Sequence, residues 1–94
     1  MAEANLARPM PDELLLREKA REAIRNGNVP IAKPGRTWGG PGTGEACAVC
    51  GEPVRRSDLG FELEFQPETA KYHFHIRCLA AWEFERTKVP GSSL

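Results

Sequence analysis

The sequence predicts a small α+β fold, with a β-hairpin and a C-terminal helix preceded by an N-terminal helix and a linker. One observation is an alternation of apolar with small or acidic residues along 59–65, which is the period of a strand with one buried face. A second is the helical run IRCLAAWEFERTK at 76–88, which ends before Val89-Pro90-Gly91. The third is two close pairs of Cys and His residues, CAVC at 47–50 and HIRC at 75–78.

Length and composition indicate one globular domain with a modest core. A chain of 94 residues buries only about 60–65% of its unfolded surface. Hydrophobic residues make up 40% and charged residues 28%, and the formal net charge is zero, so the charge of the whole molecule does not indicate an anionic partner. No apolar run approaches the roughly 20 residues that span a bilayer, and the N-terminus lacks the features of a secretory signal. We therefore expect a cytoplasmic protein that binds neither a membrane nor a small-molecule substrate.

The first element expected is a helix over residues 11–26, after a disordered tail at 1–10. Pro11 suits the first helical position, and Asp12 and Glu13 place negative charge at the positive end of the helix dipole. Gly27 offers a left-handed stop. The apolar stripe of this helix is thin, so it needs a domain or a partner to dock on; it consists of Leu16, Ala20, Ala23 and Ile24, with Leu15 at its edge.

Residues 27–45 contain six glycines and three prolines, which predicts a linker without regular structure. Trp38 lies in the middle of it, and we expect its indole to cover the small core, since a fully solvated tryptophan is unusual. Residues 46–88 then form the folded unit. In it the strand at 59–65, the turn QPETAK and the strand YHFH make a hairpin that leads into the last helix. A disordered tail is expected at 89–94.

The Cys and His pairs predict a metal site. Zinc binds four tetrahedral thiolate or imidazole ligands, and proteins supply them as close pairs. Cys47 and Cys50 form the first pair, and Cys78 belongs to the second. Its companion is His75, which shares a helix face with Cys78 at a spacing of three, or alternatively His73, as ligand or as a neighbour of the metal.

Other interpretations of the cysteines are weaker. An odd number of cysteines without an export signal argues against a disulfide framework. A redox CxxC follows a strand and opens a helix in a βαβ unit, and the Gly/Pro-rich approach here differs from that setting. A core this small supplies about 3–5 kcal/mol, whereas structural zinc supplies about 10–16 kcal/mol in small fingers. We therefore expect one structural Zn²⁺ to fold this half of the chain.

The order CxxCG, hairpin and HxxC resembles a treble-clef zinc finger, with Cys47, Cys50, His75 and Cys78 in the ligand places. The stretch FHxxCLxxW, residues 74–82, is also similar to half-sites of RING-like and LIM-like modules. Those modules bind a second zinc for which this chain has no ligands, so their ubiquitin-ligase role is not implied. The whole chain is similar to a group of short bacterial zinc-binding proteins, which implies no particular activity.

The predicted site favours a binding module over an enzyme. Three cysteines and a histidine fill the coordination sphere of zinc, whereas a catalytic zinc keeps a position open. We expect either a protein-interaction or regulatory adaptor or, as the alternative, a DNA-binding finger. The candidate partner-binding residues are two leucines of the first helix and six basic residues: Leu14, Leu15, Arg17, Arg21, Lys33, Arg36, Arg55 and Arg56. The glutamates beside the basic residues make nucleic acid the second choice.

Overall fold

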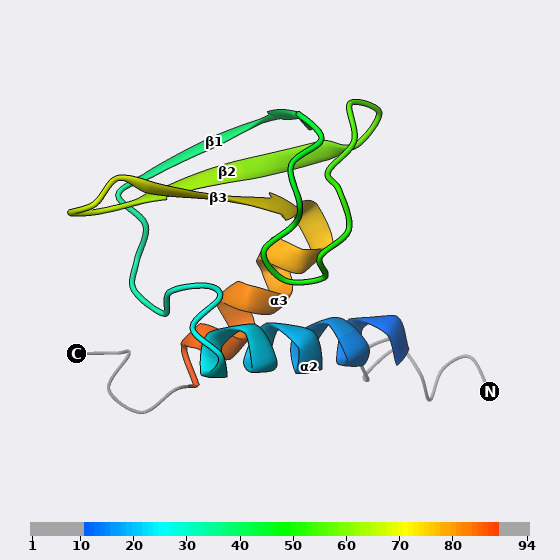
Figure 1. Cartoon of the computed structure of the whole chain (residues 1–94). Coiled ribbons are helices and arrows are strands. Elements are labelled where there is room, and N and C mark those ends of the chain that lie inside the picture. The colour runs from blue at the N-terminus through cyan, green and yellow to red at the C-terminus, as the bar shows by residue number, and fades with distance from the viewer. Residues whose placement is uncertain (1–10, 89–94) are drawn as a thin grey trace.

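The chain folds into a sheet, a central helix and an outer helix, stacked in that order (Figure 1). The computed structural model describes residues 11–88, so the tails expected at 1–10 and 89–94 lie outside the described residues. The elements, in chain order, are α2 (Pro11–Arg25), β1 (Arg36–Pro41), β2 (Leu59–Phe65), β3 (Ala70–His75) and α3 (Ile76–Arg86). No helix within residues 11–88 has the length and apolar character needed to cross a membrane.

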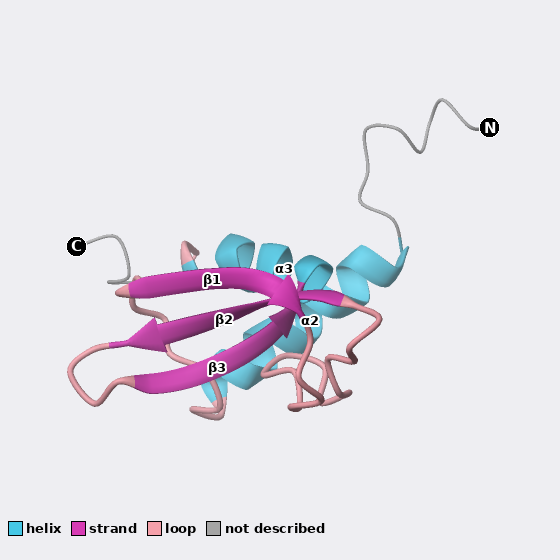
Figure 2. Ribbon diagram, turned by 90° about the horizontal axis from the view of Figure 1, so that it is seen from above, coloured by secondary structure: helices cyan, strands magenta, loops and turns pink. Residues whose placement is uncertain are grey.

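The three strands form one antiparallel sheet in the order β1-β2-β3 (Figure 2). The expected hairpin is β2 with β3, and its register places Phe61 opposite Phe74 and Leu63 opposite Tyr72. Side chains alternate between the two faces of a strand, so these residues share the face that α3 covers. The opposite face of the sheet carries the charged residues of β2.

β1 corrects the expectation that residues 27–45 lack regular structure. Six of these residues pair with β2, from Arg36 opposite Glu64 to Pro41 opposite Leu59. Glycine tolerates this close packing: a Cβ at Gly39 would lie 3.0 Å from Cε1 of the Phe61 ring. The backbone groups of β2 gain partners on both sides, which outweighs the low strand propensity of the segment.

Trp38 does not cover the core, contrary to expectation. It lies on β1 opposite Glu62, so its side chain is on the polar face of the sheet, and 42% of it is exposed. The Lys71 ammonium lies 5.6 Å from the centroid of its ring. The core is instead centred on Trp82, Phe74 and Leu63, whose side chains are fully buried.

Trp82 joins α3 to both the sheet and the segment after α2. Its ring packs edge-on against Phe65, with centroids 5.9 Å apart, and contacts Phe74 at 5.5 Å. Its Nε1 donates a hydrogen bond of 2.8 Å to the carbonyl oxygen of Pro30. The buried polar end of the indole is therefore satisfied by backbone of the segment expected to be a linker.

α2 docks on α3 through the stripe predicted from the sequence. Ala20 and Ala23 are buried, and their small side chains allow the two helices to approach closely. Around this contact, the Arg21 Nε donates to the buried carboxylate of Glu85 over 3.1 Å. The N-terminal helix therefore belongs to the same packed unit as the sheet.

Candidate metal centre

Cys47 and Cys50 lie in a tight turn closed by backbone hydrogen bonds. The Cys47 amide donates to Glu52 O over 2.8 Å, and the Gly51 amide donates to Cys47 O over 3.0 Å. Gly51 has a φ of +81°, a conformation that side chains disfavour and glycine adopts freely. The turn thereby directs both sulfurs to one side.

The other two residues lie where β3 becomes α3. His75 is the last residue of β3 and the N-cap of α3, with extended φ and ψ of −70° and 157°. Cys78 follows in the first helical turn, so its side chain lies above that of His75. A hydrogen bond of 2.8 Å from the Ala48 amide to His73 O ties the cysteine turn to β3.

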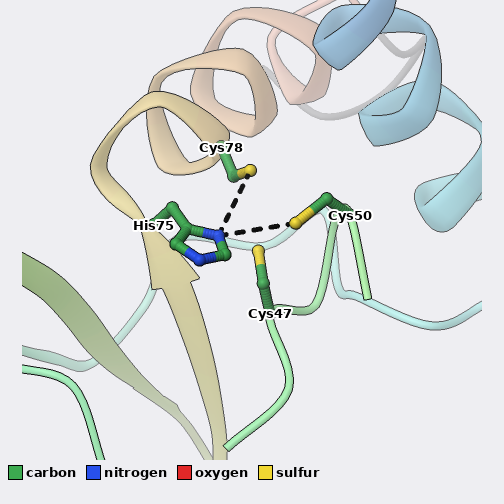
Figure 3. Close-up of side chains that lie close together, drawn as sticks. All are labelled: Cys47, Cys50, His75 and Cys78. Atoms are coloured by element: carbon green, nitrogen blue, oxygen red, sulfur yellow. Dashed lines mark hydrogen bonds between the residues drawn. The ribbon is translucent and has the colours of Figure 1, made fainter. Parts of the chain in front are cut away.

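The structure brings these four residues into one cluster (Figure 3). One ligand atom from each of Cys47, Cys50, His75 and Cys78 lies within 4.8 Å of the others. His75 Nδ1 is 3.4 Å from Cys50 Sγ and 3.8 Å from Cys78 Sγ. Metal–sulfur bonds of about 2.3 Å and metal–nitrogen bonds of about 2.0 Å at a tetrahedral ion imply a sulfur–nitrogen separation of about 3.5 Å. The cluster therefore fits one tetrahedral metal ion.

The four residues of the cluster are largely shielded from solvent. Cys47 and Cys78 are each 3% exposed, and Cys50 and His75 are half-buried. All three thiols are free, which agrees with the expectation that they form no disulfide framework. The Cys47 sulfur also accepts a hydrogen bond of 3.4 Å from the Val49 amide, a contact that favours the thiolate form a metal requires.

Two groups that the sequence analysis missed orient the imidazole of His75. Its Nε2 lies 3.1 Å from the carbonyl oxygen of Pro53 and 3.9 Å from Asp58 Oδ2. Because a carbonyl oxygen can only accept, Nε2 carries the proton and Nδ1 presents its lone pair to the sulfurs. Such outer contacts fix a metal-binding histidine. No fixed sequence spacing links Pro53 or Asp58 to His75, so the sequence held no signal for them.

The three sulfurs differ in how readily each gives up its proton. The Cys78 thiol donates to Cys47, which lowers the pKa of Cys47 to about 4. The same contact, together with burial, raises the pKa of Cys78, and burial raises the pKa of Cys50. One thiolate and two thiols therefore face each other at neutral pH, and a metal ion must displace two protons to bind all three sulfurs.

His73 lies apart from the cluster. It is opposite Glu62 on the polar face of the sheet, and its backbone, which bridges to Cys47 and accepts a hydrogen bond from the Ala48 amide, joins it to the cysteine turn. Of the two histidines weighed from the sequence, the structure brings His75 to the sulfurs.

The candidate partner-binding residues do not form one surface. Leu14 and Leu15 are exposed on α2, at 53% and 50%. Arg17 and Arg21 make contacts within the protein although Arg21 stays exposed: the Arg17 guanidinium lies 3.9 Å from the centroid of the Phe84 ring, and Arg21 pairs with Glu85. The remaining basic residues are exposed but scattered over the segment after α2, strand β1 and the loop before β2; they are Lys33, Arg36, Arg55 and Arg56.

Comparisons of the chain with protein-family models, with curated proteins and with solved structures found no match. The fold and the cluster therefore define a small α+β protein whose site of three cysteines and one histidine is able to hold one metal ion.

Proposed function

We propose that this protein is a structural-zinc module of treble-clef type that acts as a small protein-interaction adaptor. The observation that carries the proposal is the cluster of three cysteines and His75, which joins the cysteine turn to the start of α3. The proposal is supported by the order of turn, hairpin and helix, which is the order that the resemblance to a treble clef implies, and by the second ligand pair at the junction of strand and helix. β1 is an addition to that arrangement.

Zinc is the metal that suits this donor set best. Thiolates are soft ligands that favour zinc over magnesium, calcium or manganese, and a tetrahedral site of three sulfurs and one nitrogen is typical of structural zinc. The ion would tie Cys47 and Cys50 to His75 and Cys78 across an otherwise small core. It thereby adds stability to a described core in which ten apolar residues are buried besides the ligands Cys47 and Cys78.

A structural role follows from the number of protein donors. Four donors fill a tetrahedral zinc and leave no position for a reactive water, so we propose a module without enzymatic activity. His73, the remaining histidine, lies on the polar sheet face opposite Glu62 and contributes no acid–base group at the metal.

The adaptor role rests on apolar side chains that the fold leaves exposed. Leu14 and Leu15 are half exposed on α2, although the same helix buries its alanines against α3. Exposed neighbouring leucines are typical of a surface that contacts another protein. We place the protein in the cytoplasm, where its free thiols stay reduced.

The DNA-binding alternative draws less support. Arg17 and Arg21 make contacts within the protein, so α2 offers fewer free cations to phosphates than its sequence suggests. The exposed basic candidates Lys33, Arg36, Arg55 and Arg56 lie on three separate segments of the described chain. Titration of labelled duplex DNA at about 50 and about 200 mM salt tests this alternative, which requires a steep loss of affinity with salt.

Cross-linking mass spectrometry of the zinc-loaded protein in a cell lysate tests the adaptor function. We expect a defined partner cross-linked to the wild-type chain and to the control variant Glu18→Gln, which changes the same helix without adding charge among the leucines. The double variant Leu14→Glu/Leu15→Glu is expected to lose it. Absence of any protein partner, together with salt-dependent DNA binding, would replace the proposal with the alternative.

A further inference from the structure

The outer edge of β1 offers unpaired backbone groups. The Gly42 amide donates to Asp58 O over 3.0 Å, and Gly42 continues the register in which Gly40 lies opposite Gly60. In an antiparallel pair every second residue bonds to its partner strand. Trp38 and Gly40 therefore bond to β2, whereas Thr37 and Gly39 direct their N–H and C=O groups away from the sheet.

The backbone contacts at the opposite edge of the sheet, on β3, give the same assignment of inward and outward residues. That edge also has a partner within the chain. His73 O accepts from the Ala48 amide, and Cys47 bridges to His73, so odd-numbered residues of β3 point outward. The even-numbered residues of β3 therefore bond to β2, where they lie opposite the odd-numbered residues Phe61 and Leu63. The even-numbered residues of β2 are then the ones that bond to β1. Within residues 11–88 the cysteine turn thus occupies the β3 edge at His73, whereas Thr37 and Gly39 on the β1 edge have no backbone partner.

A hollow lies beside this edge on the polar face of the sheet. Its volume is about 120 Å³, and its walls include Trp38, Gly40, Val54, Glu62 and His73. Ligand pockets for small molecules and cofactors are larger, at about 300–1,000 Å³. The hollow has the size of a site for one side chain.

Gly40 leaves the hollow open, although the packing around it would admit a larger side chain. A Cβ placed on Gly40 meets no atom within 4 Å, and its φ is not in the left-handed region. Gly60, opposite it, differs, because a Cβ there would come within 2.6 Å of Val54 Cγ1. The fold requires glycine at position 60, whereas glycine at position 40 leaves free space beside the Trp38 indole.

The charges around the hollow favour an uncharged occupant. Lys71 Nζ lies 3.6 Å from Glu62 Oε2 and 5.6 Å from the centroid of the Trp38 ring. Lys71 therefore already neutralises the carboxylate and supplies the cation that the indole face attracts. The surface that remains is the indole, Val54, glycine backbone and His73, which suits an aliphatic side chain better than a charged one.

We propose that the β1 edge binds an extended peptide segment of a partner protein as an additional antiparallel strand. Thr37 and Gly39 exchange hydrogen bonds with two residues of the peptide, and the aliphatic residue between those two lies opposite Trp38. Its side chain projects onto the same face as the indole and extends over Gly40. Pro41 has no N–H and ends the pairing, so the recognised stretch is short.

An extended peptide fits this edge better than a second copy of the chain does. Figure 2 shows the helices reaching past β1 beneath the sheet. A two-fold pairing of two β1 strands would bring a second helical layer into that same region, whereas a lone strand adds only in the plane of the sheet. This inference rests on the proposed adaptor function, for which it names one binding surface and the chemistry of its partner.

The test uses the zinc-loaded full chain and a phage-displayed library of short random peptides. We expect selected peptides to carry an aliphatic residue within a proline-free stretch. As synthetic peptides they should shift the NMR signals of the Thr37 and Gly39 amides and of the Trp38 indole. N-methylation of the two residues that flank the aliphatic one should weaken binding at least about fivefold, because it removes two backbone donors.

Variants of the chain give the matching test from the protein side. Thr37→Pro removes an N–H that points away from the sheet and leaves the hydrogen bonds between β1 and β2 in place. It should weaken peptide binding at least about threefold. Thr37→Val keeps that N–H and serves as its control. Gly40→Val fills the hollow and should weaken binding about tenfold. Metal content and NMR dispersion, measured for each variant, verify that the fold is intact.

The proposal is overturned if no peptide is selected, if the peptide shifts are confined to α2, or if the Thr37→Pro variant folds and binds like Thr37→Val. A concentration-dependent dimer that protects the Thr37 and Gly39 amides would assign the edge to a second copy instead. If a cross-linked partner is found but is insensitive to Thr37→Pro, the adaptor function stands and only this surface fails. If no peptide and no partner bind, both fail.

Discussion

Replacing each histidine with alanine separates the metal site from its surroundings. His75 lies 3.4 and 3.8 Å from two sulfurs and also bonds to Pro53 O, so His75→Ala removes one of four donors. Structural zinc contributes about 10–16 kcal/mol, and an equal share for each donor is about 3 kcal/mol. That share corresponds to a loss of about a hundredfold in zinc affinity, since about 1.4 kcal/mol is a factor of ten.

His73→Ala should leave zinc affinity within about threefold of the wild type. The substitution keeps the backbone carbonyl that accepts from the Ala48 amide, and it removes only a side chain on the polar face of the sheet. Changes at such positions are usually within about 0.5 kcal/mol. His75→Cys, which restores a fourth donor, is expected to recover most of the affinity that His75→Ala loses.

Competition with a chromogenic zinc chelator measures all three variants on one scale. Thermal unfolding with and without chelator shows whether the affinity change reaches the fold. The reasoning is refuted if His73→Ala weakens binding as much as His75→Ala, or if His75→Ala binds zinc as tightly as the wild type.

Three further predictions follow from individual contacts. Asp58→Asn, which weakens the support of the His75 imidazole, should lower zinc affinity about tenfold without unfolding the chain; an unchanged affinity would show that Pro53 O alone suffices. Trp82→Phe should lower the free energy of unfolding by about 1–3 kcal/mol, because the Pro30 carbonyl loses its partner and the core loses volume; urea denaturation of the zinc-loaded protein measures this, and a loss below about 0.5 kcal/mol would contradict it. Zinc binding at pH 7 should release about two protons, since the pKa values of Cys50 and Cys78 are raised while that of Cys47 is about 4. The affinity for zinc should therefore rise with pH. Calorimetry in buffers of different ionisation enthalpy measures the proton release, and finding none would refute this prediction.

The elements and the cluster that the sequence predicts are those encoded by local patterns. Strand alternation, the i,i+3 spacing of His75 and Cys78, and the two residues between Cys47 and Cys50 each act over a few positions. Their coincidence in one chain indicated a shared site, and the structure brings the four ligand atoms together. The alanine stripe of α2 likewise anticipated a docking face, now seen against α3.

The features that the sequence analysis missed depend on distant contacts. β1 forms because the backbone groups at the free edge of β2 need hydrogen-bond partners. The Gly-rich segment that supplies them carries no local sequence pattern of a strand. Trp38 was expected in the core because tryptophan is usually buried, but the strand alternation of β1 assigns it to the other face. Pro53 and Asp58 contact His75 only because the chain after the cysteine turn folds back toward the end of β3.

Native mass spectrometry of the purified chain, followed by NMR after metal removal, addresses the central claim most directly. One zinc ion should accompany each chain, and a chelator that extracts it should collapse the signal dispersion of the cysteine turn and the β3–α3 junction. A chain that carries no metal and keeps a dispersed spectrum would contradict the account, because the packing of so few buried side chains would then hold the fold alone.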